Sequence, residues 1–283
     1  MSLVAVVGSV NLDLVATAPR LPRPGETVTD ASFARHPGGK GGNQALSARR
    51  MGAGVSMIAR IGDDTEGEAA TALLRDGGVD LTACRVSHGT HTGIAVIVVD
   101  AAGENQIVVA PGANRLLGVS DVDVAGADVV VCQLEIPLPT VEHAIRTAAF
   151  GVLNCAPARQ LPPGLLAECD LVVVNQTEAD FYGSDLAHAR LVVKTLGADG
   201  AVALDRGVEV ARVPSLRVDT VDTVGAGDTF VGTLAVELAN GASLVEALRM
   251  ATAAGAIATT RSGAQPAIPT RDEVLAARER LES

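Results

Sequence analysis

The 283-residue sequence has few aromatic residues, no basic run and no long apolar run. Aromatics make up 2% of the chain, so Val, Ala and Leu must fill the core of a protein that is 48% hydrophobic. The net charge of −11 argues against nucleic acid or an anionic membrane as a partner. No apolar stretch approaches the roughly 18 residues of a membrane span, and the start lacks a basic region, so we expect a cytoplasmic protein.

Cysteine is also scarce. The four cysteines, Cys84, Cys132, Cys155 and Cys169, show no metal-type spacing, and three of them lie in or next to apolar runs. We therefore expect buried thiols and no disulfide framework.

Short apolar runs alternate with helical patterns along the chain. Val- and Leu-rich runs bounded by turn residues indicate buried strands at 3–7, 129–134, 152–153, 171–174 and 191–196. Helical patterns lie near 41–51, 65–76, 138–149, 226–239, 243–260 and 270–281. This alternation predicts an α/β fold, with a doubly wound, mostly parallel sheet flanked by helices on both faces. We expect one domain over 1–283.

Two segments, 12–36 and 92–110, interrupt this alternation. Both look extended, and the second reads as a hairpin with strands at 92–100 and 106–110. We expect a small β-sheet lid that projects from the main domain. The apolar hairpin strand at 94–99 has little nearby to cover it, and an exposed edge of this kind invites pairing with another chain.

Residues 222–232 read Asp-Thr-Val-Gly-Ala-Gly-Asp-Thr-Phe-Val-Gly, a glycine-flanked turn that leads into an amphipathic helix. Gly225 and Gly227 allow successive N–H groups to point into one concave nest, and the helix start adds partial positive charge. A phosphoryl group would bind well there, and Asp228 could take the proton from an attacking hydroxyl. An acid in a first helical turn is also common without function, and this motif alone does not separate the two interpretations.

A second glycine cluster, Gly38-Gly-Lys-Gly-Gly-Asn-Gln44, opens another helical pattern. Near the start of the chain, Asn11 and Asp13 follow the strand at 3–7 and point the same way on an extended chain. Amide, carboxylate and ammonium groups on short turns suit a polyhydroxylated ligand, because each sugar hydroxyl both donates and accepts. Taken singly, each of these motifs could be no more than glycines in a turn or polar residues at the end of a strand.

Together and in this order, the motifs resemble the ribokinase-like (phosphofructokinase B) family of ATP-dependent sugar and nucleoside kinases, over essentially the whole chain. The motifs that carry the resemblance are Gly8-Ser-Val-Asn-Leu-Asp13, Pro24-Gly-Glu-Thr27, Gly38-Gly-Lys-Gly-Gly-Asn-Gln44, Gly62-Asp-Asp64, Gly112-Ala-Asn114, Gln133-Leu-Glu135, Asn175-Gln-Thr-Glu178, Thr195-Leu-Gly197, Asp222 to Asp228 and Gly263-Ala-Gln-Pro266. One departure is the crossover at 179–194, which is shorter than the helical crossover usual in the family.

The resemblance implies roles for the matching positions. Gly225, Ala226 and Gly227 would form the anion hole, with Asp228 as the catalytic base. The implied sugar-binding residues are Asn11, Asp13, Gly39, Lys40, Asn43, Glu135 and Asp228. The implied nucleotide-binding residues are Asn175, Thr195, Leu196, Gly197, Ala198, Asp199, Gly200, Gly227, Asp228 and Thr252.

The family resemblance also implies ATP, Mg²⁺ and an activating K⁺. Glu178 would bind magnesium through water. The potassium positions are Asp222, Val224, Ala258, Arg261, Gly263 and Ala267. Ala267 and Thr252 depart from the residues common at these positions, a hydroxyl residue and a histidine. A homodimer that pairs through the lids is implied as well.

The implied activity is in-line phosphorylation of a small sugar by ATP, with D-ribose converted to ribose 5-phosphate as the favoured reaction. Deoxyribose, fructose or a nucleoside remains open as the acceptor, although Phe33 is the one aromatic residue of the expected lid. A non-catalytic sugar-binding regulator is a further alternative, and the presence of Asp228 and its glycines argues against it. A dinucleotide-dependent oxidoreductase needs Gly-x-Gly-x-x-Gly after an early strand, and the segment after Val7 does not match.

Overall fold

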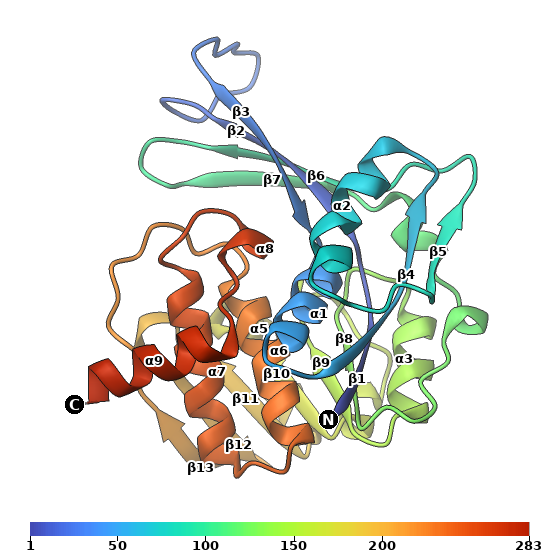
Figure 1. Ribbon diagram of the computed structural model, residues 1–283, viewed down its shortest axis with the longest axis vertical. Helices are drawn as coiled ribbons and strands as arrows, with labels where there is room; N and C mark the ends of the chain where they lie inside the picture. Colours follow the sequence, from blue (N-terminus) through green and yellow to red (C-terminus); the bar gives the residue numbers. More distant parts are fainter. Residues whose placement is uncertain (283) are drawn as a thin grey trace.

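The chain folds into a large sheet covered by helices and a small sheet that projects from it, as Figure 1 shows for the computed structural model, which describes residues 1–282. The large sheet has nine strands in the order β13-β12-β11-β10-β9-β8-β1-β4-β5. Its strands are β1 (Leu3–Val7), β4 (Gly54–Gly62), β5 (Cys84–Ser87), β8 (Val129–Cys132), β9 (Gly151–Asn154), β10 (Leu171–Val174), β11 (Leu191–Thr195), β12 (Ala201–Asp205) and β13 (Val208–Val213).

The strands from β5 to β11 pair in parallel, and β12 and β13 add two antiparallel strands at one edge. The predicted doubly wound, mostly parallel sheet is therefore confirmed. The helices are α1 (Lys40–Arg50), α2 (Thr65–Asp76), α3 (Leu138–Thr147), α4 (Leu165–Glu168), α5 (Gln176–Tyr182), α6 (Ala226–Ala239), α7 (Leu244–Ala258), α8 (Ala264–Ala267) and α9 (Arg271–Glu282).

The sheet separates two apolar layers, because successive residues of a strand point to opposite faces. In β1, Val4 and Val6 pack into one buried cluster, and Ala5 and Val7 pack into the other. The first cluster contains side chains of α1, α2, α6, α7 and α9, and the second contains side chains of α3, α4 and α5. This alternation puts α1 and α6 side by side on one face, and α5 on the other.

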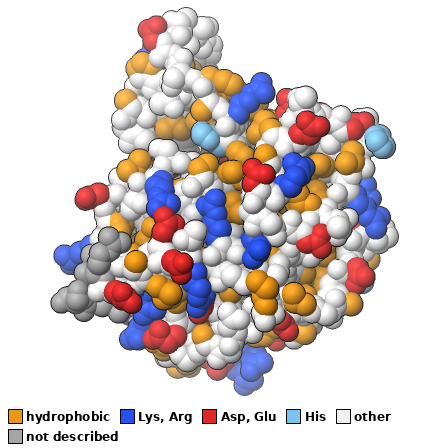
Figure 2. Space-filling model, viewed as in Figure 1, with side chains coloured by type: hydrophobic (Ala, Val, Ile, Leu, Met, Phe, Trp, Pro, Cys, Tyr) orange, Lys and Arg blue, Asp and Glu red, His pale blue; other side chains and the backbone are white. Residues whose placement is uncertain are grey.

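The projecting sheet has the order β3-β2-β6-β7, with β2 at Asn11–Thr17, β3 at Ser32–Gly38, β6 at Gly93–Val99 and β7 at Asn105–Ala110. We call this four-stranded sheet the lid; Figure 2 shows it as a lobe standing out from the main body. The expectation that the strand at 94–99 has an exposed edge is wrong, because β6 pairs with β2 on one side and β7 on the other. The exposed apolar residues lie mainly on β7, where Ile107, Val108 and Val109 are all exposed.

Three smaller expectations can also be compared with the fold. The short crossover at 179–194 holds the end of α5 and a 3-10 helix at Gly183–His188, so a helix is still present there but is brief. Within residues 1–282, the four cysteines are free thiols, and Cys132, Cys155 and Cys169 are buried as predicted. Among the described helices, none is long and apolar enough to cross a membrane.

Candidate active site

The loop before α6 is the segment from which we expect an anion hole. Gly225 caps the helix in the left-handed region with φ of 78°, and α6 then begins at Ala226. An added Cβ at Gly225 would lie 2.9 Å from Ala264, so the close approach of the α8 segment also requires glycine here. The first N–H groups of α6 are free of helical partners, and they can bind an anion.

Asp228 lies in the first turn of α6 and is 8% exposed. Two consecutive side chains of α1 hold its carboxylate. The amide Nδ2 of Asn43 donates to Oδ2 at 2.9 Å, and the amide Nε2 of Gln44 donates to Oδ1 at 2.9 Å. Gln44 was missed as a site residue from the sequence, although its place beside Asn43 in the glycine-rich motif was a usable signal.

The implied sugar-binding residues gather around Asp228 where the lid meets the main sheet. Glu135 accepts a hydrogen bond from the hydroxyl of Ser9 at 2.5 Å and from the backbone N–H of Lys40 at 3.1 Å. An added Cβ at Gly39 would lie 2.7 Å from the backbone nitrogen of Asn11, so the two segments are in close contact. The structure therefore brings together residues that are more than 200 positions apart in the chain.

Charges in this cluster influence one another strongly. Burial raises the pKa of Asp13 to about 7, and the nearby carboxylates of Glu135 and Asp228 add to the rise. Burial opposes the charge of Lys40, but the carboxylates of Asp228 and Glu135 outweigh it and raise the pKa of Lys40 above its ordinary value. A single ammonium thus balances several acids, and a ligand entering the site would meet both charges and hydrogen-bonding groups.

A cavity of about 230 Å³ lies directly beside Asp228. Lys40, Asn175 and Glu178 line it together with Gly225 and Gly227 of the anion hole. Asn175 and Glu178 form a reciprocal cap at the start of α5, and burial raises the pKa of Glu178 above its ordinary value. The acid and the glycine N–H groups make this cavity suitable for phosphate groups with a hydrated cation.

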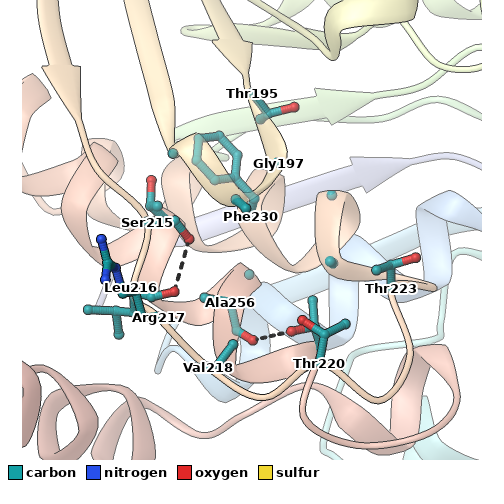
Figure 3. A pocket seen from close by; sticks show the side chains of 17 residues that line it. Thr195, Gly197, Ser215, Leu216, Arg217, Val218, Thr220, Thr223, Phe230 and Ala256 are labelled. Carbon is teal, nitrogen blue, oxygen red and sulfur yellow. Dashed lines mark hydrogen bonds between the residues drawn. The ribbon is translucent and has the colours of Figure 1, made fainter.

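A larger cavity of about 440 Å³ adjoins it and is lined in part by α6 and α7 (Figure 3). Thr195, Thr223 and Gly227 line both cavities. Of the predicted nucleotide residues, those that line the larger one are Thr195, Gly197, Ala198, Gly200, Gly227 and Thr252. Leu196 and Asp199 do not line either of these two cavities.

One wall of the larger cavity was not predicted. It is formed by the segment from Ser215 to Thr220, which follows β13 and has no regular structure. Phe230 and Gly255 complete the lining from α6 and α7. The segment lacks a glycine-rich or charged motif, so the sequence carried no signal for it.

The implied potassium positions lie in the loops of Asp222 and Gly263, which Asp222 joins, and at the ends of α7 and α8. The Oδ1 of Asp222 accepts from the N–H of Val224 at 2.9 Å, and its Oδ2 accepts from the N–H of Gly263 at 2.8 Å. Arg261 forms an ion pair with Glu273, while Ala258 and Ala267 are buried. Residues 1–282 contain no group of three or more His, Cys, Asp and Glu side chains placed to hold a metal ion.

Comparison with known proteins agrees with this geometry. The chain matches the pfkB family carbohydrate kinase over residues 1–271. Ribokinase from Haemophilus influenzae is 37% identical, over 95% of this chain and 96% of its own. Deoxyribokinase from Salmonella typhi is 34% identical, over 95% of this chain and 96% of its own. The structure of Arabidopsis thaliana ribokinase complexed with ribose and ATP superimposes with a TM-score of 0.87 at 28% identity, covering 98% of this chain and 99% of that one.

The fold and the cavity beside Asp228 therefore define an ATP-dependent carbohydrate kinase. The chain belongs to the pfkB family of carbohydrate kinases.

Proposed function

We propose that this enzyme transfers the γ-phosphoryl group of ATP to D-ribose and forms ribose 5-phosphate. The observation that carries the proposal is the position of Asp228. Its carboxylate contacts Asn43 of the implied sugar-binding residues, and it lines the smaller of two adjacent cavities that suit a nucleoside triphosphate. The similarity to ribokinases, one of which has been solved with ribose and ATP, supports ribose as the acceptor.

The reaction is an in-line displacement at phosphorus. The sugar hydroxyl oxygen forms a new bond to the γ-phosphorus while the bond to the departing ADP oxygen breaks, and the hydroxyl proton passes to the carboxylate of Asp228. The N–H groups at Gly225, Ala226 and Gly227 stabilise the negative charge on the transferring group. Lys40 lines the same cavity as Asp228 and adds positive charge to that region.

We propose Mg²⁺ and K⁺ as the metal ions of this enzyme. Magnesium supplies charge neutralisation on the phosphates when bound, and Glu178 would hold it through water, since this buried carboxylate lines the smaller cavity. Potassium would take oxygen ligands from the loops of Asp222 and Gly263. Asp222 already links these two loops, so an ion there would stiffen the segment that carries the anion hole.

Deoxyribose, fructose and a nucleoside are the alternative acceptors for the same site. Deoxyribose is the second candidate, because a deoxyribokinase is nearly as similar in sequence as the ribokinases. Fructose remains a weaker candidate. A nucleoside is disfavoured, since Phe33 of the lid is 63% exposed and is the sole aromatic residue among 12–36 and 92–110.

The test is an assay of ADP release with a panel of pentoses, hexoses and nucleosides. We expect D-ribose to give the highest kcat/KM, with deoxyribose next. A higher value for deoxyribose or a nucleoside would replace ribose as the acceptor, and the absence of sugar-dependent ADP release would favour a sugar-binding regulator.

We further propose that the enzyme acts in the cytoplasm as a homodimer. The exposed apolar side chains of the lid support the dimer, because Ile107, Val108 and Phe33 are each more than half exposed. Pairing of two lids would cover these residues and the unpaired edge of β7.

A further inference from the structure

Two buried amide side chains, Asn154 and Gln44, lead as a hydrogen-bonded chain from the backbone of β10 to Asp228, and a third, Gln133, donates to Gln44. Gln44 and Gln133 are fully buried, and Asn154 is 7% exposed. Gln44 does not line either of the two cavities described above, so it cannot touch a substrate there. Gln44 contacts the carboxylate of Asp228 directly, and it also contacts Asn154, which lines the smaller cavity.

The orientation of this chain follows from its anchor. The backbone oxygen of Val173 can only accept, so Asn154 turns its Nδ2 towards it, at 3.3 Å, and presents Oδ1 to Gln44. Gln44 must then turn Nε2 towards Asn154, at 3.0 Å, and the same nitrogen reaches Oδ1 of Asp228 at 2.9 Å. The other end of the Gln44 amide, Oε1, accepts from Nε2 of Gln133 at 2.8 Å. Only one orientation of the three amide groups, which we call the polarity of the chain, makes all these hydrogen bonds.

From this polarity we propose that Gln44 is a positioning residue for the reaction, which holds the carboxylate of Asp228 as a hydrogen-bond acceptor facing the sugar hydroxyl. A reversed Gln44 amide would place its oxygen against the carboxylate and lose the bond from Gln133. The inference rests on the proposed function, in which Asp228 is the base. The Nε2 of Gln44 can only donate, so its contact fixes Oδ1 of Asp228 as an acceptor and holds the carboxylate in place.

Other charged groups face Asp228 and remain unchanged in the test. They are Lys40 on α1, Asp13 on β2 and Glu178 on α5, each of which interacts electrostatically with Asp228. Glu135, after β8, acts on the same cluster through Lys40 and Asp13. These charged groups are the same in the wild type and in the Gln44 variants, so a change in the pH profile reports on the hydrogen bonds of the Gln44 amide.

The experiment measures kcat and KM against pH, with D-ribose and MgATP, for Gln44→Met and Gln133→Met. Both variants remove an amide at a fully buried site, but Gln133→Met leaves both hydrogen bonds of the Gln44 nitrogen in place. For Gln44→Met we expect kcat at neutral pH to fall about tenfold and the acid limb of kcat to move up by about one pH unit, with a ribose KM within about twofold of wild type. Gln133→Met should keep the wild-type midpoint.

Gln44→Glu is the second variant. Glutamate has the size of glutamine, so this variant serves if Gln44→Met does not fold. Two adjacent carboxylates resist joint ionisation, so its acid limb should move further up than that of Gln44→Met. Acid limbs that stay at the wild-type position would show that Gln44 is merely structural. Asp228→Asn separates the role of Asp228 from that of Gln44. If Asp228→Asn stays active, Asp228 is not the base and the Gln44 inference falls with it. If Asp228→Asn is inactive but the acid limbs of the Gln44 variants stay at the wild-type position, only the Gln44 inference falls.

Discussion

Asn114 fixes the orientation of Asn11, because its Nδ2 donates to the side-chain oxygen of Asn11 at 2.7 Å. The orientation of Asn114 is in turn set by the backbone of Val10, whose N–H reaches Oδ1 of Asn114 at 2.9 Å. Since the oxygen of Asn11 is engaged, its NH₂ group is the part left for a ligand. The proposed sugar site would therefore offer a donor at Asn11 and a carboxyl at Asp13, two residues further along β2.

We predict that Asn114→Leu raises the KM for ribose about tenfold, because Asn11 loses the partner that orients it, a loss worth on the order of 1.4 kcal/mol. The KM for ATP should change little, since Asn114 lies on the lid side of the site. Asn105→Leu, on the exposed outer end of β7, is the control and should leave both constants unchanged. Equal increases for ribose and ATP would contradict the orienting role.

Asp228→Asn should preserve the fold and the binding of both substrates while lowering kcat by roughly 10²–10⁴-fold, the usual effect of removing a positioned base. The asparagine keeps the shape of the side chain, its oxygen can accept from Gln44, and its NH₂ group can donate to Oδ1 of Asn43 once that amide turns over. Steady-state kinetics and thermal unfolding check the two parts separately. A variant that phosphorylates ribose near the wild-type rate would show that Asp228 is not the base.

Asp13 is predicted to make the protein less stable as the pH rises. The pKa of Asp13 is raised from 3.8 to about 7 in the folded enzyme, so between these values the folded state binds more protons than the unfolded state. Stability associated with this group is therefore present near pH 4 and is lost as the pH rises towards 7, at about 1.4 kcal/mol for each pH unit in that interval.

Asp13→Asn tests this by removing the titration. Urea unfolding at pH 5 and pH 8 should show the variant gaining stability relative to wild type as the pH increases. Its KM for ribose should also rise far more than its KM for ATP, because the amide no longer accepts at both oxygens. A pH dependence identical to that of wild type would mean that Asp13 is not the titrating group.

Potassium activation can be tested with salts at constant ionic strength. We predict higher kcat in potassium than in sodium or tetramethylammonium chloride, and a loss of this difference in Asp222→Ala, because Asp222 joins the two loops that would supply the oxygen ligands. The wild-type enzyme in each salt is the reference. Equal rates of the wild type in all three salts would rule out a potassium site.

Dimerisation through the lid is predicted to depend on β7. Val108→Glu should convert the dimer into a monomer at micromolar concentration, as measured by solution scattering, since Val108 is 70% exposed on the outer strand of the lid. Val208→Glu is the matched control, because Val208 is 66% exposed on the edge strand of the large sheet. A wild-type protein that is already monomeric would refute the dimer.

The sequence was sufficient to predict those parts of the structure that depend on local patterns of residues. Helix α6 has the predicted bounds, because Phe230 and Leu234 recur at helical spacing and Gly225 precedes them. The position of β6 inside the lid could not be predicted, since it depends on pairing with β2, which is about 80 residues earlier. The contact between Gln44 and Asn154 was also inaccessible, because it joins helices and strands that only the complete sheet brings together.

The two adjacent cavities also bear on inhibition. Thr195, Thr223 and Gly227 belong to the walls of both, so the space beside Asp228 and the larger cavity lie next to each other at these residues. A molecule in which adenosine and ribose are linked by a phosphate chain would occupy both cavities at once, and its second half would bind at a high effective concentration. Affinity can then exceed that of either half by roughly 10²–10⁴-fold, provided that the linker matches the distance between the two ends. The phosphate linker length that gives the tightest binding would measure, in solution, the distance between the bound sugar and the bound nucleotide.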